Sequence, residues 1–170
     1  MKQIGIISDT HNYLDSKVFD YFKNCDEIWH AGDIGTISLA DELAAFKPLR
    51  AVYGNIDGQD VRQVYPLNNF FLCENVAVWM THIAGSPPRY NQRVREQLAN
   101  NTPKIFVCGH SHILKVMAVP KYNKMLHINP GAAGNHGFHK VKTIMRLKIE
   151  GSRIFDAEVI ELGKRGAKKK

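Results

Sequence analysis

The sequence contains few cysteines and no long apolar segment, and both absences exclude classes of protein. Its three cysteines, Cys25, Cys73 and Cys108, are an odd number without CxxC spacing, which argues against a disulfide framework and a structural zinc finger. The apolar opening at residues 4–7 stops at Ser8, so it is too short for a membrane span or a signal-peptide core. We therefore expect a cytoplasmic protein without membrane association.

The sequence also lacks a basic body, although its formal net charge is +7. Five of the 23 lysines and arginines lie at positions 164–170 beside no acidic residue, and the other 18 face 16 acidic residues. A basic stripe that could follow nucleic-acid phosphates is therefore missing, and a nucleic-acid partner is not expected. We interpret residues 163–170 as a disordered basic tail whose removal would leave folding and chemistry almost unchanged.

The length of 170 residues favours one domain, which we assign to residues 1–162. Short β-branched runs and amphipathic stretches alternate in the first part, and strands dominate the last part. The strands expected are 3–8, 27–30, 49–53, 70–73, 76–81, 105–108, 115–120, 125–129, 143–149 and 153–160, and the helices are 16–22, 38–46 and a segment from Pro88 to about Asn100. This order predicts an α/β fold in which two mixed sheets form a β-sandwich flanked by helices, with parallel early strands and antiparallel late ones.

Metal-type ligands follow five successive predicted strands. They are Asp9 and His11, then Asp33, then Asn55, then His82, and finally His110 and His112. A single Gly-Asp or Gly-Asn pair is an ordinary turn, but the same coincidence at five strand ends is hard to explain by turns alone. Because ligands bind outside the carboxyl ends of the strands in open α/β sheets, we expect the five loops to converge on one rim.

The set Asp9-x-His11, Gly32-Asp33, Gly54-Asn55, His82 and Gly109-His110-x-His112 resembles the motifs of the calcineurin-like metallophosphoesterases in identity and in order. The resemblance extends over roughly residues 1–160. The chain length, the motif at 54–57 and the turn at 129–131 are most similar to the small YfcE-type phosphodiesterases. That branch also contains the retromer subunit of the vacuolar-sorting complex.

The resemblance implies a centre of two divalent ions. Asp9, His11, Asp33 and His112 would hold one ion, and Asp33, Asn55, His82 and His110 the other, with Asp33 as the bridge. A mixed shell of carboxylate, amide and imidazole suits Mn²⁺, which we expect, and also Fe²⁺, Zn²⁺ or Ni²⁺. Two such ions activate a shared water, so the sequence predicts hydrolysis of a small phosphoester, foremost a phosphodiester, by metal-bound hydroxide. Asp33, Asn55 and His82 are the residues expected to act in catalysis.

Two further positions concern the leaving group and the phosphate. Many phosphatases of the family place a histidine directly after the asparagine of the third motif, where it protonates the leaving alkoxide; here that position is Ile56. The absence of this histidine predicts slow hydrolysis of esters with poor leaving groups. Arg89 and Arg93 follow the His82 loop and are candidate phosphate contacts, although an arginine on a helix is more often a solvated surface charge.

The other polar candidates are interpreted as supporting residues. His30 is expected beside the ligands rather than among them, and Asp57 is expected to orient Asn55 or a loop. Cys108 is expected to pack in the core. The remaining candidates are interpreted as structural, with the stretch around His136 at the border of the cleft; they are His127, His136 and His139.

Two other functions stay open. The first is a retromer-type scaffold that presents a partner surface with weak or no catalysis, against which the complete ligand set speaks. The second is a nucleic-acid binder or nuclease, against which the nearly neutral body speaks. The sequence does not decide the physiological substrate, the native metal, or whether the chain forms a homo-oligomer.

Overall fold

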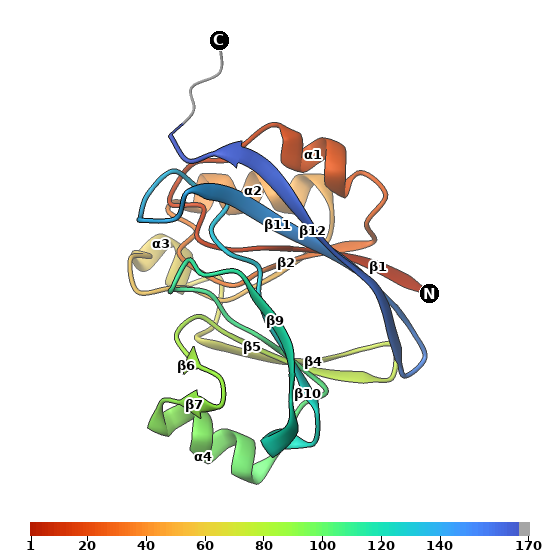
Figure 1. Cartoon of the computed structure of the whole chain (residues 1–170). Coiled ribbons are helices and arrows are strands. Elements are labelled where there is room, and N and C mark those ends of the chain that lie inside the picture. Colours follow the sequence, from red (N-terminus) through yellow and green to blue (C-terminus); the bar gives the residue numbers. More distant parts are fainter. Residues whose placement is uncertain (167–170) are drawn as a thin grey trace.

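The computed structural model describes residues 1–166, and two five-stranded sheets packed face to face make up most of it (Figure 1). The first sheet has the strand order β12-β11-β1-β2-β3. Its strands are β1 (Lys2–Ile7), β2 (Glu27–His30), β3 (Leu49–Ala51), β11 (Val141–Glu150) and β12 (Arg153–Lys164). The first three are parallel to one another, and β11 pairs antiparallel with both β1 and β12.

The second sheet has the order β4-β5-β8-β10-β9. Its strands are β4 (Asn68–Cys73), β5 (Val76–Thr81), β8 (Ile105–Val107), β9 (Lys115–Val119) and β10 (Met125–Asn129). The pairs β4–β5 and β9–β10 are antiparallel hairpins, whereas β8 runs parallel to both of its neighbours. The late hairpins β9–β10 and β11–β12 are antiparallel as expected, and β8 is parallel to β5 because the α4 crossover returns the chain to the same end of the sheet.

Helices cover the outer faces of both sheets. The helices are α1 (Lys17–Phe22), α2 (Ile37–Phe46), α3 (Gln59–Arg62), α4 (Gln92–Asn100) and the single 3₁₀ turn η1 (Pro120–Tyr122). In Figure 1, α1 and α2 lie beside the first sheet and α4 lies at the opposite end of the molecule. None of the helices that the structure describes is long and apolar enough to cross a membrane. The sandwich flanked by helices that the sequence predicts is confirmed.

The alternation of strand residues produces three apolar layers. In β5, Val76, Val78 and Met80 face the layer between the sheets, where they pack against Ile4 and Ile6 of β1. A second layer lies between the first sheet and α1 and α2, and a third between the second sheet and α4. The central strands of each sheet are thus buried on both faces, which fixes the loops at their carboxyl ends on a rigid frame.

Two expectations about elements need correction in the region between β5 and α4. The helix does not start at Pro88: residues before it form a short ribbon of β6 (Gly85–Ser86) and β7 (Arg89–Tyr90). Helix α4 starts after Asn91, whose side chain accepts a hydrogen bond from the Val94 N–H at 2.9 Å. Arg89 therefore lies on a strand and not on a helix, and the short helix α3 was not predicted.

The boundary of the expected basic tail also needs correction. Strand β12 runs to Lys164, which pairs with Val141, and the Arg165 N–H donates to the Lys140 carbonyl at 3.0 Å. Residues 163–166 are therefore part of the folded unit. The rest of the expected tail, residues 167–170, lies outside the described residues.

Candidate metal centre

The candidate ligands leave the carboxyl ends of five strands and meet on one rim of the sandwich. The loops after β1, β2, β3, β5 and β8 carry Asp9 and His11, Asp33, Asn55, His82, and His110 and His112, respectively. Backbone hydrogen bonds join these loops: the Asp9 N–H donates to the Gly32 carbonyl at 3.0 Å, and the Gly109 N–H donates to the His82 carbonyl at 3.0 Å. The rim predicted from the strand ends is thus present in the fold.

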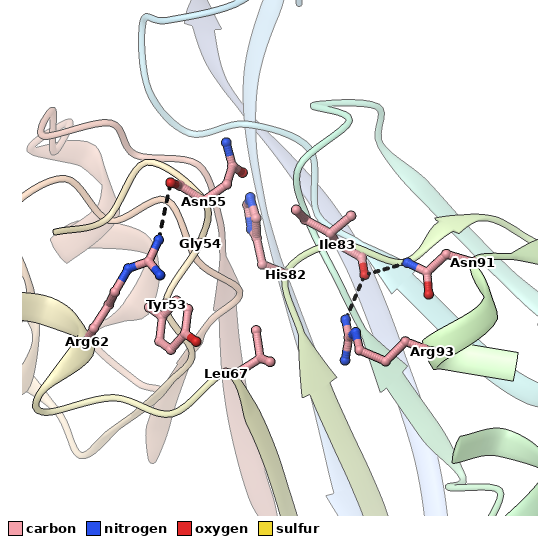
Figure 2. Close-up of a pocket in the computed structure, with 9 residues that line it drawn as sticks. All are labelled: Tyr53, Gly54, Asn55, Arg62, Leu67, His82, Ile83, Asn91 and Arg93. Atoms are coloured by element: carbon pink, nitrogen blue, oxygen red, sulfur yellow. Dashed lines mark hydrogen bonds between the residues drawn. The ribbon is translucent and has the colours of Figure 1, made fainter. Parts of the chain in front are cut away.

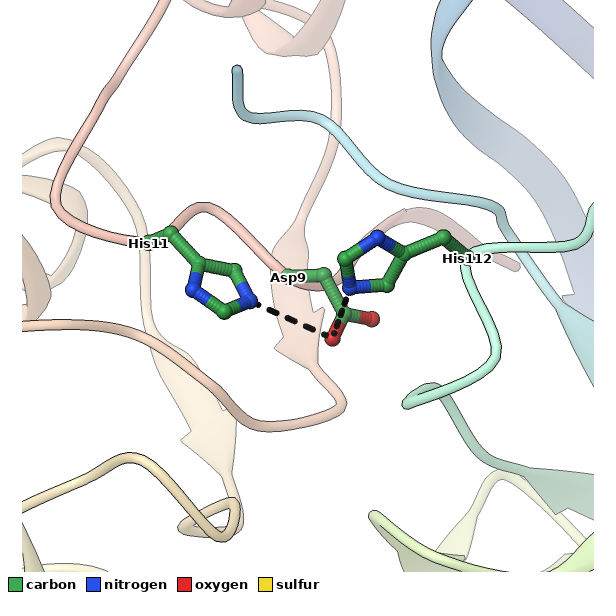
Figure 3. A group of neighbouring side chains, drawn as sticks. All are labelled: Asp9, His11 and His112. Carbon is green, nitrogen blue, oxygen red and sulfur yellow. Dashed lines mark ion pairs between the residues drawn. The ribbon is translucent and has the colours of Figure 1, made fainter. Parts of the chain in front are cut away.

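The ligands form two groups. Asp9, His11 and His112 each offer one ligand atom within 4.8 Å of the others, and Asp33, His82 and His110 do the same. Figure 3 shows the first group, in which His112 Nε2 lies 3.2 Å and His11 Nε2 3.9 Å from Asp9 Oδ1.

Asp33 lies between the two groups. Its Oδ2 atom is 3.3 Å from His11 Nε2 and 3.2 Å from His82 Nε2, so one carboxylate oxygen contacts a histidine of each group. Asn55 joins the second group, because its Oδ1 atom lies 3.0 Å from His110 Nδ1. The structure therefore brings all seven predicted ligands together, with Asp33 in the shared position.

Three buried ligand atoms have no hydrogen-bond partner within the described part of the chain. They are Asp9 Oδ1, His11 Nε2 and His82 Nε2. Leaving a buried polar atom unpaired costs about 1–3 kcal/mol, so three in one place indicate a missing partner. His82 Nδ1 donates to the Ala31 carbonyl at 2.7 Å, which leaves a lone pair on Nε2. These oxygen and nitrogen donors fit divalent metal ions.

Each buried carboxylate accepts hydrogen bonds from the protein with one oxygen and faces the histidines with the other. Asp9 Oδ2 accepts hydrogen bonds from Ser8 Oγ at 2.6 Å and from the His110 N–H at 3.1 Å. Asp33 Oδ1 accepts from the Ile56 N–H at 3.1 Å. The remaining oxygens, Asp9 Oδ1 and Asp33 Oδ2, are those that face the histidines, so both carboxylates are oriented before any ion binds.

The glycines before Asn55 and His110 are required because other atoms of the centre approach them too closely for a side chain. A Cβ atom on Gly54 would lie 2.1 Å from Asp33 Oδ1, and one on Gly109 would lie 2.2 Å from Ser8 Oγ and 2.7 Å from Asp9 Oδ2. The ligand backbones are also strained, because five of them adopt positive φ angles that side chains rarely accept. These are Asp9 (53°), His11 (44°), Asp33 (55°), His110 (73°) and His112 (62°).

Asp57 fixes two of the ligand loops. Its carboxylate accepts hydrogen bonds from the N–H groups of Ile34 at 3.1 Å, Gly35 at 2.8 Å and Gly54 at 2.8 Å. The side chain is buried, and it joins the loop that carries Asp33 to the loop that carries Asn55. The supporting role expected for Asp57 is thus a connection between two loops.

His30 supports the same turns and belongs to neither ligand group. Its Nδ1 accepts from the Gly32 N–H at 3.1 Å, and its Nε2 lies 3.0 Å from Thr10 Oγ1, which donates to the Ile34 carbonyl. Burial lowers the pKa of His30 to about 4, so the ring is neutral and the proton on Nε2 is donated to Thr10.

The electrostatics of the centre favour added positive charge. Burial raises the pKa of Asp33, but the contacts with His11 and His82 outweigh it and hold the pKa well below its usual range. In return, the Asp33 and Asp9 carboxylates raise the pKa of His82, although burial opposes this shift. The two buried acids therefore stabilise cations between them, which is what divalent ions supply.

A cleft of about 450 Å³ opens over the ligands, and the sequence did not predict all of its wall. The His136 ring stacks on His11 with centroids 4.6 Å apart, and the His139 ring meets His112 edge-on at 5.2 Å. Both histidines were interpreted as structural, but the stretch around His136 was expected at the border of the cleft, and it does lie there. Phe138, fully exposed, borders the same cleft.

The two candidate arginines are placed differently. Arg93 lines a cavity of about 490 Å³ together with the ligand residues Asn55 and His82 (Figure 2). Arg89 is exposed on β7 and lines none of the cavities that the described residues form next to a ligand. The structure therefore brings Arg93, and not Arg89, beside the centre.

Comparison with known proteins gives a family and a set of relatives. The family model of the calcineurin-like phosphoesterase superfamily domain matches residues 1–152. A probable metallophosphoesterase of Methanothermobacter thermautotrophicus is 28% identical over 165 residues, which cover 94% of this chain and 92% of that protein. A probable metallophosphoesterase of Methanocaldococcus jannaschii is 29% identical over 154 residues, which cover 86% of this chain and 76% of that protein.

Solved structures share the fold at lower identity. A novel archaeal phosphodiesterase superposes with a TM-score of 0.74 at 24% identity and covers 94% of this chain and 99% of its own. The Vps29 protein of Entamoeba histolytica in complex with zinc superposes with a TM-score of 0.72 at 17% identity and covers 95% and 98%. At these identities the likeness establishes a common architecture.

Proposed function

Because this chain belongs to the calcineurin-like phosphoesterase superfamily, we propose that it is a metal-dependent phosphodiesterase with a centre of two divalent ions, Mn²⁺ foremost. One observation carries the proposal: the Asp33 carboxylate contacts a histidine of each ligand group, and three buried atoms of the two groups have no hydrogen-bond partner among the described residues. Asp9, His11, Asp33 and His112 would hold one ion. Asp33, Asn55, His82 and His110 would hold the other.

The residues of the centre prepare it for an anionic ester. When bound, two divalent ions lower the pKa of a shared water and neutralise charge on the phosphate oxygens. The Asp9 and Asp33 carboxylates balance only half of the charge of two such ions, so the centre stays positive and attracts a phosphodiester. Asp33 is held through Oδ1 by the Ile56 N–H, so its Oδ2 is oriented for an ion, whereas Asn55 is held beside the second group by the contact of its Oδ1 with His110 Nδ1.

A scaffold comparable with the Vps29 proteins is the second candidate. The exposed apolar side chains at the border of the cleft favour it: Phe138 is 100%, Ile113 65% and Ile56 46% exposed. Such side chains are typical of surfaces that bind other proteins. The shared position of the Asp33 carboxylate between the two ligand groups favours the enzyme, because two adjacent ions are what phosphoester hydrolysis uses.

The test is hydrolysis of bis(p-nitrophenyl) phosphate by protein stripped of metal with a chelator and then supplied with Mn²⁺. Activity should appear only with the metal. Asp33→Asn should lower it by about 100-fold or more, since even a residue that merely supports a ligand is worth 10–100-fold. Asp41→Asn, a change of the same type on the exposed face of α2, is the control. Equal activity of Asp33→Asn and wild type would reject the enzyme, and metal binding without any hydrolysis would favour the scaffold.

A further inference from the structure

We propose that the cavity beside Asn55 and His82 is a subsite for a second anionic group of the substrate, so that the preferred substrate is a phosphodiester with one organic arm that carries a further phosphate. The inference rests on the proposed function and specifies its substrate class. The cavity measures about 490 Å³ and adjoins the second ligand group. In Figure 2, Arg62 and Arg93 stand on its opposite sides, with Asn55 and His82 between them.

Arg93 is a half-buried cation without an acidic partner. Its guanidinium donates to Asn68 Oδ1 at 2.9 Å, Thr81 Oγ1 at 3.1 Å and the Ile83 carbonyl at 3.0 Å, which are all neutral acceptors. No carboxylate of the described residues lies within 4.0 Å of it. Removing a charge from water without a counter-ion is costly, so this guanidinium is a site for an anion that arrives with a ligand.

Arg62 repeats the arrangement on the other wall. It packs on the Tyr53 ring at 4.5 Å, and it donates to the Asp57 carbonyl at 2.6 Å and to the Asn55 carbonyl at 3.3 Å. These partners are again neutral, and they hold the guanidinium in one orientation. Within the described residues, Nη1 of Arg62 and Nε of Arg93 donate no hydrogen bond, so both groups keep a donor for a ligand.

The rest of the wall indicates what separates the anion from the reacting ester. Tyr53, Leu67 and Ile83 supply ring and aliphatic surface, and no aspartate or glutamate lines the cavity in the part of the chain that the structure describes. An organic arm fits this surface. Two guanidiniums approaching from different sides match a phosphate, which accepts hydrogen bonds on several oxygens in different directions, better than a planar carboxylate.

The experiment compares two substrates that differ only in the second anion. Thymidine 5′-(p-nitrophenyl phosphate) and its 3′-phosphorylated derivative release the same phenol from the same diester, and thymidine serves only as the organic arm. Wild type with Mn²⁺ should show kcat/KM at least about tenfold higher for the 3′-phosphorylated substrate, since hydrogen bonds to charged groups are each worth about that factor. The difference should lie mainly in KM.

Arg93→Gln and Arg62→Gln should each reduce this substrate ratio toward unity, with the metal content of the variants measured first. Arg95→Gln, on the exposed face of the same helix as Arg93, is the matched control and should keep the ratio. Arg62 is exposed, so its variant still reports if Arg93→Gln does not fold. A wild-type ratio of one, or a ratio that persists in both variants, would overturn the subsite.

Failure of the subsite is distinguishable from failure of the proposed function. If neither ester is hydrolysed, the proposed function fails, and the subsite is tested by calorimetric binding of thymidine 3′,5′-bisphosphate to the metal-free protein. Weaker binding by both Arg62→Gln and Arg93→Gln than by Arg95→Gln supports the subsite. Equal binding by the three variants contradicts it.

Discussion

Ile56 contributes to the centre through its backbone and borders the cleft with its side chain. Its N–H holds Asp33 Oδ1 at 3.1 Å, a contact that any residue could make. Its side chain is 46% exposed and lines the cleft over the ligands, at the position where a histidine would protonate a leaving group. The position is therefore open to a proton donor without loss of the backbone contact.

Ile56→His should change how the rate depends on the leaving group. Without a donor the leaving oxygen departs as an anion, so log kcat/KM of wild type should fall steeply as the leaving-group pKa rises. The histidine should flatten this plot and accelerate alkyl esters by up to about 10²–10⁴-fold, the usual value of general-acid catalysis. A matched series of aryl and alkyl diesters measures this dependence. Ile56→Leu is the control, and its plot should stay as steep as that of wild type.

A flat plot for wild type, in conditions where chemistry limits the rate, would contradict this account. Another group would then supply the proton. His30 is unsuitable, because both of its ring nitrogens are engaged by Thr10 and Gly32. His136, stacked on His11 in the cleft, would be the residue to replace next.

His127 should make folding sensitive to acid. The ring is buried, with Nδ1 2.8 Å from the Tyr90 hydroxyl, and burial together with Lys115 lowers its pKa from 6.5 to about 4. The unfolded chain therefore binds one more proton than the folded chain between these two pH values, and stability falls as the pH decreases through that window. The free energy of unfolding of wild type should fall by up to about 3 kcal/mol more than that of His127→Gln. Urea titrations between about pH 7 and pH 4 measure it, and parallel curves would contradict it.

Among the elements, the long strands were predictable and the short pieces were not. The β-branched run of β1 and the continuous apolar run of β5 are typical of strands that are buried on both faces. The ribbon of β6 and β7 and the helix α3 each contain too few residues to show a period. The start of α4 is set by the residue that caps its N-terminus. This residue is Asn91, whereas Pro88 was expected to open the helix.

The end of β12 holds the loop that borders the cleft. Arg165 Nε donates to the His139 carbonyl at 2.7 Å, and the Gly166 N–H donates to Asn135 Oδ1 at 2.8 Å. Residues counted as a dispensable tail from the sequence are thus attached to the loop that carries His136 and His139. Charge composition alone gave no indication of this, because both acceptors in the loop are neutral oxygens, a backbone carbonyl and an asparagine amide.

Arg165→Ala should therefore weaken catalysis without unfolding the protein. Loss of one hydrogen bond to an exposed loop is worth about 1 kcal/mol, which corresponds to a fall of about fivefold in kcat/KM if the ordered loop is needed for turnover. The melting temperature should stay nearly constant. Arg153→Ala, which removes an exposed arginine from the other end of β12, is the control. Unchanged turnover in Arg165→Ala would show that the loop does not depend on this contact.

At the scale of the whole molecule, the candidate metal centre joins the two sheets. The first group combines Asp9 and His11, which follow a strand of the first sheet, with His112, which follows a strand of the second. The second group combines Asp33 from the first sheet with His82 and His110 from the second. The convergence of these loops could be predicted from topology. Which oxygen of each carboxylate accepts a hydrogen bond from the protein, and which faces the histidines, depends on the exact positions of side chains, which the sequence does not record.

Mn²⁺ should consequently raise the melting temperature. A ligand at 100 times its dissociation constant that binds only the folded chain adds about 2.7 kcal/mol, or about 5–10 °C for a protein of this size. Differential scanning fluorimetry with and without a chelator measures the shift. Asp33→Asn should abolish most of it, and Asp41→Asn should keep it. An equal melting temperature of wild type with and without Mn²⁺ would contradict metal binding by the folded chain.

The distribution of the ligands along the chain also sets when the centre can exist during synthesis. Asp9 and Asp33 leave the ribosome early, but each group is completed only by a histidine of the loop after β8, His112 or His110. A nascent chain that ends before this loop has buried acids without their full complement of imidazoles, and it presents neither group. Neither candidate ligand group can therefore be complete until β8 and the loop after it have been synthesised.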